Sequence, residues 1–489
     1  MSVVTPAYYY DYKTHSSASV PTGSVVVASA RRTSGSSKST WSTGTKTTSS
    51  TGTTTTGTTT TTGTTTTFPA FGATTTIYAA IRTDGIAGSG TQQNPYDAST
   101  EAKFDAILAN LLKANGAQRT TLSLGAGTYT VTPVRVANTS ANPGGYVSNI
   151  PGNLEIIGAG QDKTIIRAGI VPTGNSTYWV FANIGTSPGD YFDNLTIDCN
   201  IQNQTVSTVT IDGIQSFHTS GGATNTLASN VHMIDGGNRP GDPGDSEWFG
   251  VQIGDGQTGS VAAVSQCLVD HYQGNAGCTA LSASGFITDN TVILNNNDPY
   301  GLLGNGAGGG FQNALSPSTT VSGNTCQNCT WGVYSDLGNV NGVTIKNNNL
   351  QGLYGGVWLY TLDANSTLQN IYVHNNTITK TYEAAVIIGN PATTVTNSNI
   401  FVYDNNVTTK VTSNLQYDDI FYVVAARNSE VFGNTFSVVP TNLIQNIALG
   451  PSDYGSFAWY NNQFTNGAAI PGPVGTVNHA LSGVTVPAN

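Results

Sequence analysis

The chain has 489 residues, a formal net charge of −10 and only 9% charged residues, against about 25% in typical soluble proteins. This balance argues against a nucleic-acid partner, because no basic patch is present. No apolar run reaches the length of about 18 residues that a membrane span needs. The length suits either several domains or one long repeat structure.

Residues 1–66 are expected to form a low-complexity tail or stalk. From Ser39 to Thr66 the sequence holds only Thr, Gly and Ser apart from Trp41 and Lys46. Such a tract buries too little apolar surface to offset its ordering entropy, which predicts disorder. The first residues lack a charged segment followed by an apolar one, so no classical signal peptide is visible. The composition nevertheless indicates an extracellular or cell-surface protein.

A single helix is predicted at about 99–115, at the start of the ordered part of the chain. Its apolar residues recur with helical spacing, and polar cap residues precede them. We expect this helix to cover the open end of a repeat structure, whose first coil would otherwise expose its core. Short strands are predicted to follow at 121–124, 129–131, 154–157 and 164–167. The apolar stripe consists of Phe104, Ile107, Leu108, Leu111 and Leu112.

One small motif then recurs from residue 290 to 465: an asparagine, one further residue, and an apolar or β-branched residue. Its copies are separated by 34, 24, 28, 29, 29 and 28 residues. Spacings of this size indicate stacked supersecondary units, and the alternating runs between the copies are typical of strands. We therefore expect a parallel β-solenoid with a ladder of stacked amides, in which asparagine tolerates the left-handed turn geometry. The asparagines are Asn290, Asn324, Asn348, Asn376, Asn405, Asn434 and Asn462.

The register is extended toward the N-terminus by aligning Asn194, Asn230 and Gln266 with the same motif. The steps to Asn290 are then 36, 36 and 24 residues, so the longer coils must contain insertions. The β-helix domain is expected to span 67–473, followed by a C-terminal tail at 474–489.

The head of this region resembles the pectin-lyase-like superfamily of right-handed parallel β-helix proteins. The resemblance rests on Asp84-Gly85 with the helix after it, on Gly125-Ala-Gly127-Thr128-Tyr129, on Leu154 to Ile166, and on Asn194-Leu-Thr-Ile-Asp198. It implies an all-β, right-handed parallel β-helix (solenoid) with an N-terminal capping α-helix. It implies no single activity, because the superfamily contains lyases, hydrolases, epimerases, tailspikes and adhesins. The activity motifs of polygalacturonases and pectate lyases mostly fail to appear, although Leu268-Val-Asp-His271 resembles half of one pectate-lyase element.

Three acids occupy related positions on successive coils and are the predicted catalytic group. Asp198 and Asp270 each lie four residues after their coil anchor, and Asp235 lies five after its own. Equivalent residues two coils apart are separated by roughly 9–10 Å, near the upper limit for inverting glycoside hydrolysis. His271 is included as a proton shuttle and His232 as a group that holds the substrate. Capping of backbone amides at coil corners is the alternative role for these acids.

An insertion after the second of these coils is expected to overhang the row. In it, Arg239, Glu247 and Trp248 are predicted to bind substrate, with the indole as a sugar-stacking surface. Asp242 and Asp245 offer oxygen ligands for Ca²⁺, but their spacing is not that of an EF-hand loop, and an ordinary solvated loop is the alternative. No other cofactor is indicated.

Five cysteines are too few for a disulfide scaffold. Cys326 and Cys329 are interpreted as core thiols or a local disulfide. Trp331, Trp358 and Trp459 either form a carbohydrate platform or belong to the core.

Two functional hypotheses remain. In the first, the protein binds a polysaccharide or surface glycan and cleaves it, with hydrolysis favoured over lyase chemistry. A lyase needs cations to neutralise an uronate, and between Ala168 and Thr344 the only Arg or Lys is Arg239. In the second, the protein is a non-enzymatic surface, adhesin or fibre-forming β-helix. A homo-oligomer, such as a trimer or a fibre, is compatible with either hypothesis.

Overall fold

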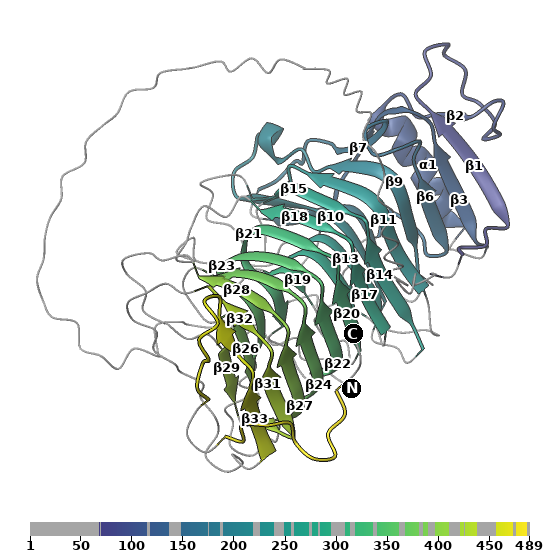
Figure 1. Ribbon diagram of the computed structural model, residues 1–489. Helices are drawn as coiled ribbons and strands as arrows, with labels where there is room; N and C mark the ends of the chain where they lie inside the picture. Colours follow the sequence, from purple (N-terminus) through teal and green to yellow (C-terminus); the bar gives the residue numbers. More distant parts are fainter. Residues whose placement is uncertain are drawn as a thin grey trace, which may run out of the picture. The chain divides into compact units, whose positions relative to one another are not determined.

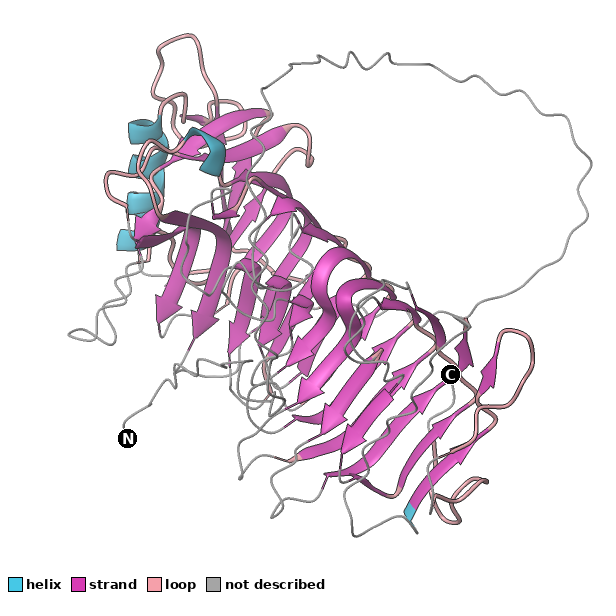
Figure 2. Ribbon diagram, turned by 90° about the vertical axis from the view of Figure 1, so that its left-hand side faces the viewer, coloured by secondary structure: helices cyan, strands magenta, loops and turns pink. Residues whose placement is uncertain are grey.

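The computed structural model describes residues 68, 70–114, 118–135, 148–174, 176–185, 189–218, 225–238, 249–255, 259–272, 276–281, 284–294, 309–312, 318–335, 340–360, 367–380, 385–389, 397–409, 421–424, 426–437, 456–472 and 476–486. The predicted tail at 1–66 lies outside these ranges. Residues 68–489 form one compact unit of stacked coils (Figure 1). The strands run side by side in parallel rows, with the helix at the N-terminal end of the stack (Figure 2).

Each complete coil contributes strands to three parallel sheets. Strand pairing is between coils and almost entirely parallel, as expected when every connection carries the chain around the coil and back to the same sheet. Such crossovers are nearly always right-handed. We name the three sheets in the order in which the chain enters them.

Sheet 1 begins with β1 (Thr75–Ala80), whose outer edge pairs with the short β2 (Tyr96–Asp97). Its further strands are β3 (Thr120–Leu124), β6 (Leu154–Ile157), the first halves of β9 (Tyr191–Asp198) and β11 (Asn225–Ile234), β14 (Val261–Ser265), β17 (Ser284–Thr288), β20 (Thr319–Ser322), β22 (Val340–Lys346), β24 (Leu368–His374), β27 (Asn397–Tyr403), β31 (Ser429–Phe432) and β33 (Phe457–Tyr460).

Sheet 2 continues from sheet 1 around a tight corner. It contains β4 (Gly127–Val131), β7 (Thr164–Ala168), the second halves of β9 and β11, β15 (Leu268–Tyr272), β18 (Thr291–Leu294), the first parts of β21 (Thr325–Ser335) and β23 (Asn349–Tyr360), β25 (Thr377–Lys380), β28 (Asn406–Thr409), β32 (Thr435–Phe436) and β34 (Gln463–Phe464).

Sheet 3 closes the coil. It contains β8 (Ser176–Gly185), β10 (Val209–His218), β13 (Phe249–Asp255), β16 (Ala276–Leu281), β19 (Gly309–Gln312), the last parts of β21 and β23, β26 (Val386–Gly389) and β29 (Phe421–Val424). The short β5 (Val134–Arg135), β12 (Gly237–Asn238) and β30 (Ala426–Arg427) and the 3₁₀ turn η2 (Ile201–Asn203) decorate the coils.

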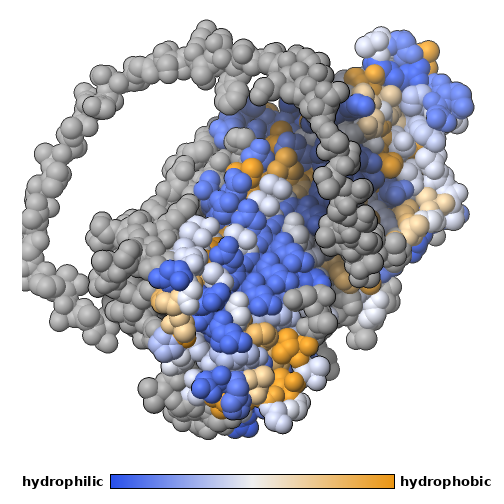
Figure 3. All heavy atoms as spheres, viewed as in Figure 1, coloured by the Kyte–Doolittle hydropathy of each residue, from blue (hydrophilic) through white to orange (hydrophobic). Residues whose placement is uncertain are grey.

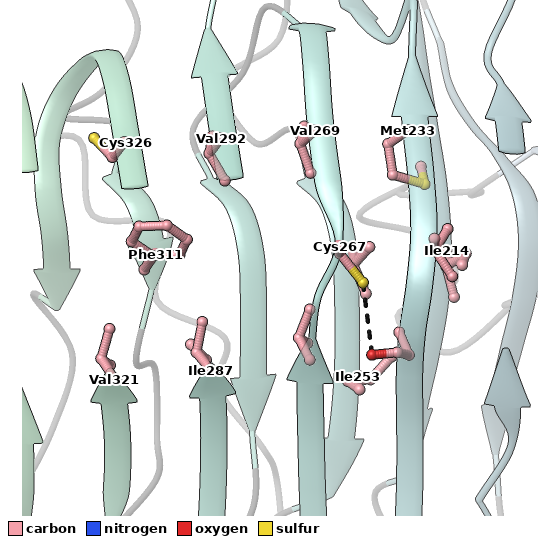
Figure 4. Packing of buried hydrophobic residues seen from close by; sticks show 14 of the residues in the cluster. Ile214, Met233, Ile253, Cys267, Val269, Ile287, Val292, Phe311, Val321 and Cys326 are labelled. Carbon is pink, nitrogen blue, oxygen red and sulfur yellow. Dashed lines mark hydrogen bonds between the residues drawn. The ribbon is translucent and has the colours of Figure 1, made fainter. Parts of the chain in front are cut away.

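The core is a set of apolar columns inside the coils. Alternate residues of each strand point inward, and equivalent residues of successive coils stack. In sheet 2 one such column passes from Met233 through Val269 and Val292 to Cys326, all of them fully buried. Figure 4 shows these side chains meeting those of sheets 1 and 3 in the centre of the coil. The outward side chains of the described surface are mostly hydrophilic in the view of Figure 3.

The N-terminal cap is the helix that the sequence predicted. α1 spans Glu101–Lys113, and the Thr100 side chain accepts the backbone N–H of Lys103. Phe104, Ile107, Leu108 and Leu111 are buried, and the Phe104 ring packs on Tyr129 of β4 at 5.3 Å between centroids. Leu112 was expected in this buried stripe, but 36% of it is exposed. The buried stripe is therefore one residue narrower than the sequence predicted.

The amide ladder is confirmed. Along all seven asparagines, each side-chain Nδ2 donates to the Oδ1 of the next at 2.9 Å. Each Oδ1 that receives such a bond also accepts the backbone N–H of the same donor residue. Each Nδ2 donates in addition to a backbone carbonyl of sheet 1, as Asn376 does to Ile345 at 2.9 Å. The ladder therefore satisfies a row of buried polar groups at the corner between sheets 1 and 2.

The register assigned to the first coils was wrong by one residue. Asn194, Asn230 and Gln266 have positive φ values of 54°, 50° and 54°, and the residue in register with them is Asp289, with a φ of 57°. The residue in register with Asn290 is Cys267, whose backbone N–H donates to Asn290 Oδ1 at 2.9 Å. Each of these corners thus has a left-handed residue followed by a buried one, which is a ladder asparagine from Asn290 onward. Asparagine suits both positions for different reasons.

The C-terminal end is closed by chain that returns onto the last coil. Val477 pairs with Ala458 of β33, and the backbone N–H of Leu481 donates to the buried carboxylate of Glu430 at 2.7 Å. Part of the segment expected as a tail, residues 476–486, therefore covers the last strand edge of sheet 1.

Candidate functional site

Sheet 2 carries the predicted acids on its outward face. Asp198 ends β9 and Asp270 lies in β15, and both are in register with Ile234 of β11, which lies on the coil between them. The two aspartates therefore share one outward column two coils apart, which is roughly 9–10 Å between equivalent backbone atoms. Asp235 follows Ile234 in the left-handed conformation, with a φ of 52°, so it lies beside the column at a turn.

Arg167 belongs to the same column and was not among the predicted residues. It is in register with Asp198 on the preceding coil, and its Nε donates to Asp198 Oδ2 at 2.7 Å. Asp198 also accepts the backbone N–H of Asn200 at 2.9 Å. Its carboxylate is thus held by a cation and a turn, with only 5% of the residue exposed. Continuing the column one coil further toward the N-terminus would have revealed the arginine.

A fourth acid approaches from sheet 3. Asp212 of β10 is fully buried. Burial, followed by the nearby carboxylates of Asp212, Asp198 and Asp235, raises the pKa of the Cys199 thiol well above its usual value. Three acids therefore lie near this buried, unreactive thiol, at the point where the chain leaves sheet 2. The sequence analysis missed Asp212 because the residues around it show only the alternating apolar and polar pattern of an ordinary strand.

The two predicted histidines both belong to sheet 2. His232 is half-buried and lies two residues before Ile234, hence on the same outward face. His271 coincides with a register shift between Asp270 and Tyr272 against β18. A bulge of this kind re-aims the strand locally and is common beside functional sites. The side chain of His271 lies outside the described residues.

The predicted insertion cannot be placed. Arg239, Asp242, Asp245, Glu247 and Trp248 all lie outside the described residues, so their roles in substrate and Ca²⁺ binding stay predictions. Within the described residues, no group of three or more His, Cys, Asp or Glu side chains could hold a metal ion.

A separate buried acid lies at the other end of β9. Asp190 is fully buried and accepts hydrogen bonds from Asn183 Nδ2 at 2.7 Å, Ser216 Oγ at 2.9 Å and the backbone N–H of Leu154 at 3.2 Å. Loss of hydration outweighs these donors and raises the pKa of Asp190 to about 7. The group ties sheets 1 and 3 together and faces the interior, so it belongs to the scaffold.

The cysteines and tryptophans belong to the core. Cys326 and Cys329 are both buried free thiols, which leaves the core-thiol interpretation. Trp331, Trp358 and Trp459 are 1%, 8% and 4% exposed, which leaves the core interpretation for these three residues.

Comparisons with known proteins find similarity among solved structures. No protein-family profile matches the chain, and no curated protein matches it in sequence. Among solved structures, the A-module of a mannuronan C-5 epimerase from Azotobacter vinelandii is similar over 79% of this chain and 95% of its own, with 16% identity and a TM-score of 0.47. The fold is established by the strand pairing itself, which is parallel between successive coils and makes the chain a parallel β-helix.

Two further solved structures are similar at this level of fold. A surface protein and adhesin of Streptococcus pneumoniae matches 74% of this chain and 93% of its own, with 13% identity and a TM-score of 0.36. A tailspike protein of bacteriophage CBA120 matches 76% of this chain and 59% of its own, with 11% identity and a TM-score of 0.33. Among the described helices, none is long and apolar enough to cross a membrane.

Proposed function

We propose that this β-helix protein acts outside the cell or at its surface on a neutral or weakly charged polysaccharide, which it cleaves by hydrolysis. The observation that carries the proposal is the outward column of sheet 2 that holds Asp198 and Asp270 two coils apart. Inverting hydrolysis needs two carboxyl groups separated by about 6.5–9.5 Å, which leaves room for a water molecule opposite the leaving group.

The two aspartates have different surroundings, which suggests different roles. Asp198 forms an ion pair with Arg167, and an ion-paired carboxylate suits a base that takes a proton from the attacking water. Asp270 is half-exposed on the other coil and is assigned as the acid that protonates the glycosidic oxygen as the bond to the sugar carbon breaks. Asp235 lies at the turn beside this column.

The charge distribution favours a neutral substrate. Arg239 is the only Arg or Lys between Ala168 and Thr344, and Arg167 already pairs with Asp198. A chain of uronates laid across this surface would meet carboxylates with little compensating positive charge. A lyase acting on such a polymer is correspondingly disfavoured.

The test is the release of reducing ends from a panel of neutral and acidic polysaccharides. Asp198→Asn and Asp270→Asn should each lower the rate about 10²-fold or more, since general acid–base groups contribute that much. Asp289→Asn is the matched control, because Asp289 is an exposed acid at a left-handed corner that asparagine also tolerates. Unsaturated ends in place of reducing ends would mean a lyase and would contradict the charge argument.

A non-enzymatic surface or fibre role is the second candidate, and one observation favours it. The carboxylate of Asp198 accepts from Arg167 and from the N–H of Asn200, as a purely structural corner acid would. Binding to a polysaccharide without any product, across the whole panel, would support this role over hydrolysis. Whether copies of the chain assemble remains a prediction.

A further inference from the structure

Beyond the acids, the outward face of sheet 2 continues as two straight files of uncharged polar side chains. The first file follows the position just after each ladder asparagine. Consecutive coils contribute Thr325, Asn349, Thr377, Asn406, Thr435 and Gln463, each in register with the next. All six are half-buried or exposed, so this file forms part of the protein surface.

The second file lies two residues further along each strand and is continuous with the acids. From Asp270 the register passes to Ile293 and Gln327, and from there to Gln351, Thr379 and Thr408. Backbone hydrogen bonds of Ser437 and then Thr465 to the preceding coil continue the same register. From Asp270 to Thr465 the file crosses seven coil steps, which is roughly 34 Å at the spacing of neighbouring strands.

The surface is rigid because its spacing is fixed from below. The buried amide ladder lies immediately before the first file and joins consecutive coils by side-chain bonds of 2.9 Å. Hydroxyl and carboxamide groups are therefore presented in fixed rows before any ligand arrives, which reduces the entropy lost on binding.

The dimensions of this surface favour a ligand that lies along the coil axis over one that lies along a single strand. A strand such as β25 or β28 has only four residues, so only two outward side chains face a ligand that lies across the sheet. Along the coil axis the same chemistry repeats on every coil. Between Thr325 and Thr465 neither file contains a charged residue, and hydroxyl and amide groups both donate and accept hydrogen bonds. A long neutral polyol matches these properties.

We propose that the two files of sheet 2 from Thr325 to Thr465 are a binding track for a neutral polysaccharide chain that lies parallel to the coil axis. The inference rests on the proposed function, whose acids lie at one end of the same track. It adds a substrate class to that function: long, neutral chains in preference to short oligosaccharides or polyanions.

The track is tested by electrophoresis of the full chain through native gels that contain mixed-linkage β-glucan, galactomannan or polygalacturonate. Gln351→Arg with Thr379→Arg places bulky cations on the track. The matched control is Thr320→Arg with Thr344→Arg, which adds the same two cations at half-buried outward positions of sheet 1 that are in register on neighbouring coils. We expect at least one neutral polymer to retard the wild type and the control, and the apparent Kd of the double variant to rise at least tenfold.

The proposal is overturned if neither neutral polymer retards the wild type, if only polygalacturonate does so, or if the double variant binds as tightly as the control. The acid variants separate this outcome from failure of the hydrolysis proposal. Asp198→Asn should still be retarded although it releases reducing ends about 10²-fold more slowly. Retardation of a wild type that cleaves nothing would leave the track intact and refute the hydrolysis.

Discussion

The first coils and the later coils bury different residues at the corner between sheets 1 and 2. Where sheet 1 turns into sheet 2, the early coils bury Leu195, Val231 and Cys267, whereas every later coil with a described corner buries an asparagine. The coils that carry the acids begin at Asn194, Asn230 and Gln266 and repeat at 36, 36 and 23 residues, whereas the later coils repeat at 24–34 residues and are nearly free of charge in sheet 2. Regular amide stacking thus accompanies the uncharged surface, while the acids lie on the coils without it.

The largest effect is expected from breaking the ladder in its middle. Asn376 Oδ1 accepts two hydrogen bonds from Asn348, and Asn376 Nδ2 donates to Asn405. Asn376→Leu would remove these side-chain hydrogen bonds and leave their buried partners unsatisfied. Each unsatisfied group costs about 1–3 kcal/mol of stability. We expect the free energy of unfolding to fall by about 3–5 kcal/mol in urea titrations. A loss below about 1 kcal/mol would mean that the corner relaxes and that the ladder contributes little.

A second comparison concerns one column at the start of sheet 1. Asp190 accepts the N–H of Leu154, and Ser429 accepts that of Ile400 in the equivalent place several coils later. Because the pKa of Asp190 is raised to about 7, the folded protein keeps its proton at pH values where the unfolded chain loses it. Its contribution to stability is complete below about pH 4 and is lost as the pH rises toward 7.

Stability should therefore fall by about 1.4 kcal/mol for each pH unit between about pH 4 and 7 through this group alone. Asp190→Asn should remove this slope while retaining the acceptor for Leu154. Melting temperatures of both proteins across this pH range provide the measurement. Parallel curves would show that Asp190 does not titrate in this window.

The smallest effect is expected from extending the ladder by one coil. The Cys267 thiol already donates to Ala228 O at 3.6 Å, the position that corresponds to the carbonyl bonded by each ladder amide. Cys267→Asn should therefore be accepted within about 1 kcal/mol, since its amide would find both Asn290 Oδ1 and this carbonyl. The same substitution at Val231, which has no amide on the next coil, serves as the contrast and should be clearly destabilising.

The sequence was sufficient for the fold because the coil repeats a strong local signal. The ladder followed from seven asparagines at regular spacing, and α1 followed from one apolar stripe with its cap. The register of the first coils was missed by one residue because Asn194 and Asn230 satisfy the left-handed turn, whereas Asn290 satisfies the ladder. One residue type at two adjacent positions gives an ambiguous pattern.

The candidate site was only partly accessible from the sequence. The shared column of Asp198 and Asp270 followed from counting along the coils, because both were counted from equivalent left-handed residues. The ion pair with Arg167 and the approach of Asp212 depend on contacts between coils and between sheets. The burial of Trp331 was also uncertain, since strand spacing alone does not distinguish an inward from an outward face.

The amide ladder also affects how the chain tolerates the loss or duplication of a whole coil during evolution. Because the side-chain bonds join each coil only to its immediate neighbours, excision of residues 376–404 would place Asn405 where Asn376 stood, against the same amide of Asn348. The rod would become shorter by one strand spacing, about 4.8 Å, with its corner intact. Duplication of the same segment would lengthen it by an equal increment. Length is therefore a property that this molecule can vary in whole steps, independently of the coils that carry its acids.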